Sequence, residues 1–68
     1  MKLTIETDRE VDGRWIAEVP ELPGVLAYGA TQEEAMAKAE ALAFRVLAEQ
    51  LDHGEAKPIE LSFAVAAE

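Results

Sequence analysis

The sequence predicts an α+β fold in which three strands, a helix and a fourth strand follow one another along the chain. Two observations indicate the strands and a third indicates the helix. Apolar and polar side chains alternate near the amino terminus and again after Pro58, as in half-buried strands. From Glu33 to about His53 the chain is rich in Ala, Leu, Glu and Lys and has neither Gly nor Pro, which favours a helix.

The first two strands are expected at residues 2–9 and 14–19, joined by a hairpin. The dipeptide at 12–13 is Asp-Gly, a common hairpin turn. In the first strand Leu3 and Ile5 share one face, opposite a polar face. In the second strand the residues that share the apolar, core-facing side are Trp15, Ala17 and Val19.

Two prolines and a glycine separate the second strand from a short third strand at 25–28. Pro20 and Pro23 lack a backbone donor, and Gly24 admits backbone angles that other residues avoid. Gly29 follows, and then Thr31 and Glu34 have the spacing of a capping box, which predicts the start of the helix. Gly54 is expected to end it in a left-handed conformation.

The predicted helix has two apolar faces. The first should cover the sheet and comprises Ala35, Ala39, Leu42, Ala43 and Val46, with Met36 and Leu47 at its margin. The second lies roughly opposite and comprises Ala37, Ala41, Phe44, Ala48 and Leu51. Because one sheet needs only one such face, we interpret the second face as an oligomer interface. The alternative is that Phe44 packs under a loop of its own chain.

The fourth strand is expected at 59–65, where Ile59, Leu61, Phe63 and Val65 point one way. The first three strands can form an antiparallel meander, and the helix returns the chain so that the fourth strand lies parallel to the first. The predicted sheet order is therefore 3-2-1-4, mostly antiparallel, with one helix on one face.

The chain has 68 residues and a mass of 7.4 kDa, so we expect a single domain spanning 1–68. The absence of cysteine excludes disulfides and cysteine-bound zinc, and a single histidine cannot build a histidine-rich metal site. A core this small has a thin stability margin. Self-association is the reinforcement that the sequence leaves open.

Fourteen acidic against six basic residues give a formal net charge of −8. This charge argues against direct binding of DNA or RNA and of acidic membranes, because such binding depends on clustered Lys and Arg. It favours encounter with a basic partner. No apolar run is long enough for a signal peptide or a membrane span, so a cytoplasmic location is expected.

The residues that carry chemistry do not form a recognisable catalytic set, so we expect no enzyme and no cofactor. Ser62 and His53 lack an orienting acid, and a histidine near a helix carboxyl terminus is also favoured by the dipole. Three outward glutamates, Glu6, Glu18 and Glu60, would form an oxygen-ligand metal site only if their strands were adjacent. No loop is suited to holding phosphate.

Residues 12–24, DGRWIAEVPELPG, and 28–35, YGATQEEA, resemble the amino-terminal domain of HicB-like antitoxins. The shared pattern is an aromatic residue on the second strand, then Val-Pro-Asp/Glu-Leu-Pro-Gly, then Gly-x-Thr-x-Glu-Glu-Ala at the start of a long helix. In this chain, the residues that define this pattern are Trp15, Pro20, Pro23, Gly24, Gly29 and Thr31. The similarity covers about residues 1–55 and implies a reduced ribonuclease-H-like fold.

The resemblance also implies a function. Such antitoxins bind HicA, a small basic toxin that cleaves mRNA, and cover its catalytic surface, often as dimers or tetramers. On this basis the acids expected near a toxin are Glu21, Glu33 and Glu34. The alternative is that Glu21 is a solvated loop residue and that Glu33 and Glu34 only stabilise the start of the helix. Val25 stands where family members often have Cys, and Ala30 where they often have Asp. The DNA-binding module that family members carry after this domain is not expected here.

Three functional hypotheses follow. The first is a HicB-like antitoxin that occludes a small basic ribonuclease. The second is a homo-oligomeric binding or structural module without a toxin. The third, which the residues favour least, is a residual metal-dependent nuclease that uses strand carboxylates such as Glu6 and Glu60.

Overall fold

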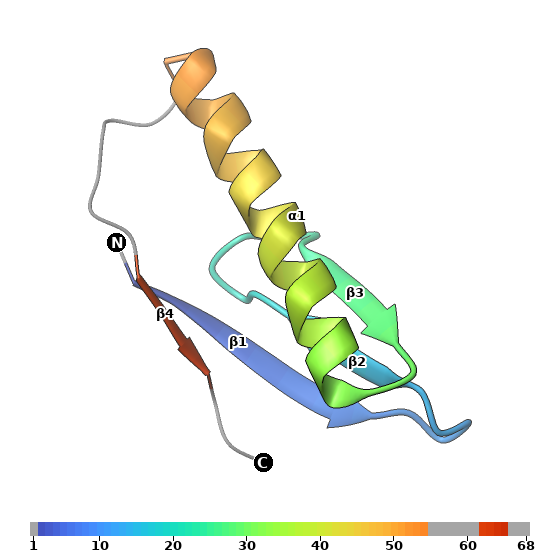
Figure 1. The fold of residues 1–68 in the computed structure, drawn as a ribbon. Helices are drawn as coiled ribbons and strands as arrows, with labels where there is room; N and C mark the ends of the chain where they lie inside the picture. Colours follow the sequence, from blue (N-terminus) through green and yellow to red (C-terminus); the bar gives the residue numbers. More distant parts are fainter. Residues whose placement is uncertain (1, 55–61, 66–68) are drawn as a thin grey trace.

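Four strands and one helix follow one another in the predicted order in the structure, a computed structural model that describes residues 2–54 and 62–65 (Figure 1). The elements are β1 (Lys2–Arg9), β2 (Trp15–Glu18), β3 (Leu26–Gly29), α1 (Gln32–Asp52) and β4 (Ser62–Val65). The predicted strand at 59–65 is thus found at its carboxyl half, and residues 59–61 lie outside the described residues.

The sheet has the order β3-β2-β1-β4, which confirms the predicted α+β fold and strand order. β1 pairs antiparallel with β2, β2 antiparallel with β3, and β1 parallel with β4. α1 packs on one face of this sheet, over β3, β2 and part of β1 (Figure 1). The relation to a ribonuclease-H-like fold remains a prediction.

The hairpin between β1 and β2 turns at the predicted Asp-Gly dipeptide. Gly13 has a φ of 92°, and its N–H donates to the carbonyl of Glu10 at 2.9 Å. Asp12 accepts from the backbone N–H of Arg14 at 3.1 Å and forms an ion pair with its guanidinium at 2.8 Å. The backbone N–H and the guanidinium of Arg14 lower the pKa of the Asp12 carboxyl.

Residues 19–25, between β2 and β3, form a tight loop, and the third strand begins at Leu26, one residue later than predicted. Val25, predicted to begin the third strand, instead closes this loop: its N–H donates to the carbonyl of Leu22, and its carbonyl accepts from Val19, both at 3.0 Å. Gly24 has a φ of 88°, which explains the requirement for glycine before this closure. The loop contributes three buried side chains, Val19, Leu22 and Val25, to the core.

Helix α1 begins at the predicted cap. The hydroxyl of Thr31 accepts from the N–H of Glu34 at 3.1 Å, as in a capping box. The returning bond differs from the prediction, because the carboxylate of Glu34 accepts from Ala30, one residue before the cap, at 2.6 Å. Gly54 has the expected positive φ, 70°, after the cap at His53. In the described part of the chain, no helix combines the length and apolar character needed to cross a membrane.

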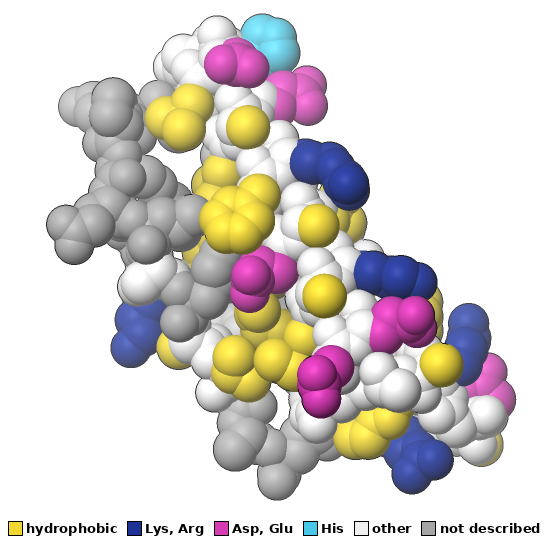
Figure 2. All heavy atoms as spheres, in the orientation of Figure 1, with side chains coloured by type: hydrophobic (Ala, Val, Ile, Leu, Met, Phe, Trp, Pro, Cys, Tyr) yellow, Lys and Arg dark blue, Asp and Glu magenta, His cyan; other side chains and the backbone are white. Residues whose placement is uncertain are grey.

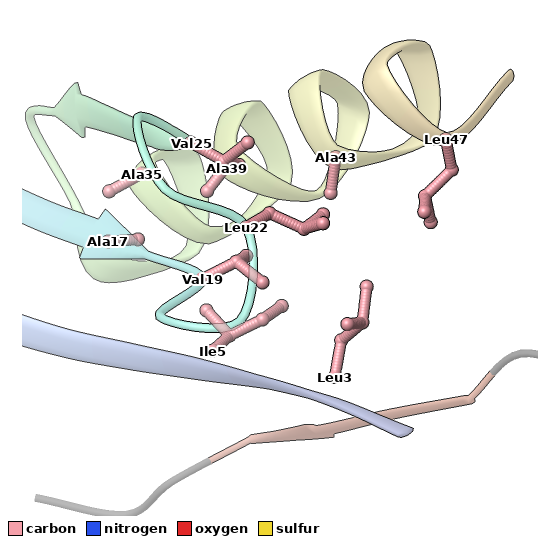
Figure 3. Close-up of a cluster of buried hydrophobic side chains, with 10 residues drawn as sticks. All are labelled: Leu3, Ile5, Ala17, Val19, Leu22, Val25, Ala35, Ala39, Ala43 and Leu47. Atoms are coloured by element: carbon pink, nitrogen blue, oxygen red, sulfur yellow. The ribbon is translucent and has the colours of Figure 1, made fainter. Parts of the chain in front are cut away.

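The core lies between α1 and the sheet (Figure 3). Alanines line most of the buried side of the helix, so the helix backbone lies close to the strands. Toward the end of the helix, Leu47 points toward Leu3 of β1 (Figure 3). The ten buried apolar residues are Leu3, Ile5, Ala17, Val19, Leu22, Val25, Ala35, Ala39, Ala43 and Leu47.

Three of the predicted core positions are shifted. Leu47, expected at the margin, is 5% exposed, whereas Leu42 and Val46 are only partly buried. The buried side of α1 is therefore rotated toward Leu47, whose side chain points toward the buried Leu3 of β1. Trp15, the first residue of β2, is also only partly buried, and the guanidinium of Arg9 lies 5.8 Å from the centre of its ring.

Candidate functional site

The second apolar face of α1 lies at the surface, as the predicted interface requires. Phe44 is 47% exposed and Leu51 is 43% exposed. Ala37 and Ala48 are exposed and Ala41 is half-buried. Figure 2 shows hydrophobic side chains spaced along the visible side of the helix, with basic side chains along one flank. We call these five residues the helix strip. Its pairing with a second chain stays a prediction.

The acids predicted to face a toxin lie at two places. Glu33 and Glu34 are exposed in the first turn of α1, and Glu34 also holds the Ala30 N–H. Glu21 is in the loop after β2, where its Oε1 accepts from the backbone N–H of Thr4 at 3.0 Å. This bond ties the loop to β1 beyond the point where β2 ends. Glu21 and Glu34 thus each have a structural role.

The backbone N–H of Thr4 lowers the pKa of the Glu21 carboxyl below its ordinary value of 4.5. A lowered folded-state pKa stabilises the fold above the ordinary value, and this stabilisation is lost as the pH falls through the folded value. We therefore expect wild type to exceed Glu21→Gln in stability at pH 7, and the difference to shrink as the pH falls below 4.5. Urea unfolding at a series of pH values measures this difference. A gap that is constant with pH would contradict the role of the carboxylate.

The face of the sheet turned away from α1 combines the outward glutamates Glu6 and Glu18 with apolar residues that were not predicted to share a surface with them. Leu3, Ile5 and Ala17 point to the core, so the alternate residues point outward. Register places Glu6 opposite Glu18 and Glu18 opposite Leu26 in one row. In the next row Asp8 lies opposite Ile16, and Ile16 opposite Tyr28. We call these six residues the outer face; they are Glu6, Asp8, Ile16, Glu18, Leu26 and Tyr28.

Two of the three glutamates considered as metal ligands are neighbours on this face. Glu6 and Glu18 lie directly across the β1–β2 pair, whereas Glu60 lies outside the described residues. Within residues 2–54 and 62–65, no three His, Cys, Asp or Glu side chains are grouped so that they could hold a metal ion. The ring Nδ1 of His53 lies 2.9 Å from the carbonyl of Glu49, at the helix end, and Ser62 is exposed on β4.

The Glu6–Glu18 pair gives a prediction about stability. Like charges directly opposite in a sheet are unfavourable, so Glu18→Gln should raise the free energy of unfolding by about 0.2–1 kcal/mol. Glu33→Gln removes the same charge from the first turn of α1, where the helix dipole favours an acid, and should lower it by about 0.3–1 kcal/mol. Urea unfolding at low salt measures both changes. Changes of the same sign would mean that net charge, not position, determines the effect.

A hollow of about 310 Å³ lies beside the first hairpin and is lined by Glu10, Val11, Asp12 and Arg14. Val11 is fully exposed, and Asp12 and Arg14 are joined in their ion pair. The hollow is therefore an open part of the surface formed by a turn, and it brings together no set of groups suited to catalysis.

Comparisons with protein-family models, with curated proteins and with solved structures each find no match to this chain.

Proposed function

We propose that this protein is a HicB-like antitoxin that acts in the cytoplasm by binding a small basic RNA-cleaving protein and covering its catalytic surface. The observation that carries the proposal is the uncompensated negative charge. The chain has a formal net charge of −8, and the ion pair within the described residues, Arg14–Asp12, engages one of its fourteen acids. A surface of this kind attracts a basic partner and repels nucleic acid.

The motif residues support the same proposal. Pro20, Pro23 and Gly24 lie in the loop that fixes the exit from β2, and Gly29 and Thr31 lie at the junction of β3 with α1. These positions build the framework of the domain and leave its acidic surface available. A partner that carries opposite charge would gain association rate and selectivity from that surface.

Co-expression tests the proposal. The product of each gene next to the coding sequence would be expressed alone and together with this protein, and growth, mRNA integrity and co-purification would be measured. We expect one neighbour to be a basic protein that halts growth and cleaves mRNA alone, and that is neutralised and co-purifies when both are present. Association should weaken as salt rises. Neighbours that are all harmless, or a toxin that this protein leaves active, would overturn the proposal.

A second candidate function is a homo-oligomeric module that needs no toxin, and the helix strip favours it. Phe44 and Leu51 expose apolar surface along one side of α1, and Val65 of β4 is 56% exposed. The five residues of the strip are uncharged, and Glu40, four residues before Phe44, lies on the same side of α1 at the edge of the strip. We propose that the protein self-associates through this strip, with or without a toxin.

Phe44→Glu tests the helix strip. We expect wild type to behave as a dimer or tetramer in light scattering and Phe44→Glu to behave as a monomer, because the new carboxylates would oppose each other in an apolar contact. Lys38→Gln on an exposed position of the same helix gives the same net charge, −9, and should remain oligomeric. Circular dichroism of each variant verifies that it is folded. Wild type that is monomeric at all concentrations would contradict the interface.

A further inference from the structure

The outer face combines an apolar part with an acidic part. Its apolar part follows the edge strand β3 and the middle of β2, where Leu26 is 40% exposed, Tyr28 is 39% exposed and Ile16 is partly exposed. In the described chain, α1 covers only the opposite side of the sheet (Figure 1). An exposed aromatic residue beside two aliphatic residues is typical of the centre of a protein interface.

The acidic part lies beside it, toward β1. Glu6 and Glu18 face each other across the two strands, and Asp8 is the next outward residue on β1. No cation among the described residues bonds to Glu6 or Glu18. Retaining two like charges in this position costs stability in the free protein. A basic side chain placed between them would remove that repulsion.

Among the residues that the structure describes, the cations of this sheet face lie away from its centre. Arg14 is ion-paired with Asp12, and its guanidinium lies 4.6 Å from the centre of the Tyr28 ring. Lys2 lies at the other end of β1, opposite Ser62. The middle of the face, around Glu6 and Glu18, is therefore negative, with apolar surface next to it.

The negative charge of the outer face also determines which class of partner can bind there. A second copy stacked on this face would bring its own three acids against either the same acids or the apolar part of the face, and both contacts are unfavourable. Nucleic acid or an acidic membrane would be repelled in the same way. A basic protein surface with apolar side chains among its Lys and Arg residues matches both parts of the face.

We infer that the outer face is the docking surface for the basic partner, with Glu6, Asp8 and Glu18 receiving its cationic side chains and Ile16, Leu26 and Tyr28 receiving its apolar ones. This inference rests on the proposed function and assigns it a surface. It leaves the helix strip, on the other layer, for a second copy of this chain, so that both partners can bind together.

Amide chemical shifts test the surface without the natural partner. The ¹⁵N-labelled protein would be titrated with a synthetic peptide of about ten residues in which Lys and Leu alternate, and with a control peptide in which Glu replaces Lys. We expect shifts with the Lys peptide to concentrate on β1, β2 and β3 at the outer-face residues, and none with the Glu peptide. Shifts concentrated on α1 would overturn the inference, as would concentration-dependent shifts of the outer face without peptide, which would indicate self-association there.

Two charge-reversal variants sharpen the result. Glu18→Lys should weaken peptide binding by about tenfold or more, and it should fold because it places opposite charges across from each other. Glu49→Lys changes the net charge equally on an exposed position of α1 and should keep affinity within about twofold. Equal losses in both variants would show a diffuse charge effect and overturn the assigned surface. In co-expression, a toxin neutralised equally by wild type and Glu18→Lys would overturn the surface while leaving the proposed function standing.

Discussion

Ile5→Ala should remove a large part of the free energy of unfolding of this protein. Ile5 is fully buried in β1, beneath α1, and truncating such a side chain costs about 2–5 kcal/mol. A chain of this length has a total stability of about 3–10 kcal/mol. The loss is therefore comparable with the whole margin. Urea unfolding followed by circular dichroism would show a midpoint moved far toward zero, or no folded baseline.

Ile16→Ala is the matched control for this result. Ile16 lies on the neighbouring strand β2 but points to the outer face and is partly exposed. Both substitutions lose the same strand propensity, and only Ile5→Ala leaves a cavity in the core. Ile16→Ala should cost about 1 kcal/mol or less. Similar losses for the two variants would mean that strand propensity, rather than core packing, limits stability.

The fold could be predicted from the sequence because its signals are local. Alternation identified β1, the Asp-Gly turn placed the first hairpin, and Thr31 with Glu34 marked the start of α1. Once β1, β2 and β3 form an antiparallel meander followed by one long helix, few positions in the sheet remain for the last strand. The order β3-β2-β1-β4 follows from the rule for crossover connections.

The details that could not be predicted depend on contacts between distant residues. An ideal helical wheel gives Leu42 and Leu47 positions on either side of the core face, and only the sheet decides which one is buried. Leu47 is buried because it reaches Leu3. Val25 lies outside β3 because its backbone forms hydrogen bonds with Val19 and Leu22 across the loop. Hydrogen bonds of this kind leave no periodic pattern of apolar residues by which the sequence could reveal them.

The candidate surfaces were predictable to different degrees. The helix strip follows from periodicity alone, because Phe44 and Leu51 are seven residues apart on one helix. The outer face needs the register of two hairpins. The first register is centred on Asp12 and could have been derived from its turn, which would place Glu6 opposite Glu18. The second depends on the loop from Pro20 to Gly24, whose length does not specify the pairing of Ile16 with Tyr28.

Gly29→Ala should be among the most damaging single substitutions outside the core, for a reason of space rather than backbone angle. Gly29 is buried at the end of β3. An added Cβ would lie 2.6 Å from the backbone nitrogen of Ala35 and 2.9 Å from Oε1 of Glu34. The first of these atoms belongs to the helix backbone, so the first turn of α1 would have to move off the sheet. Overpacking of this kind costs about 1–3 kcal/mol, and a backbone clash places it at the upper end.

Gly13→Ala separates the two reasons for glycine in this chain. Gly13 has a positive φ of 92° with nothing within 4 Å of an added Cβ, so its loss should cost only the backbone strain, about 1–2 kcal/mol.

Trp15 lies opposite Gly29 in register, so the fluorescence of Trp15 should change in Gly29→Ala as α1 shifts. The double variant Gly29→Ala/Glu34→Ala should not recover stability, because Ala35 still blocks the new methyl group. Recovery would place the conflict in the Glu34 side chain instead, and the junction of β3 with α1 would then be held by the cap rather than by close backbone packing.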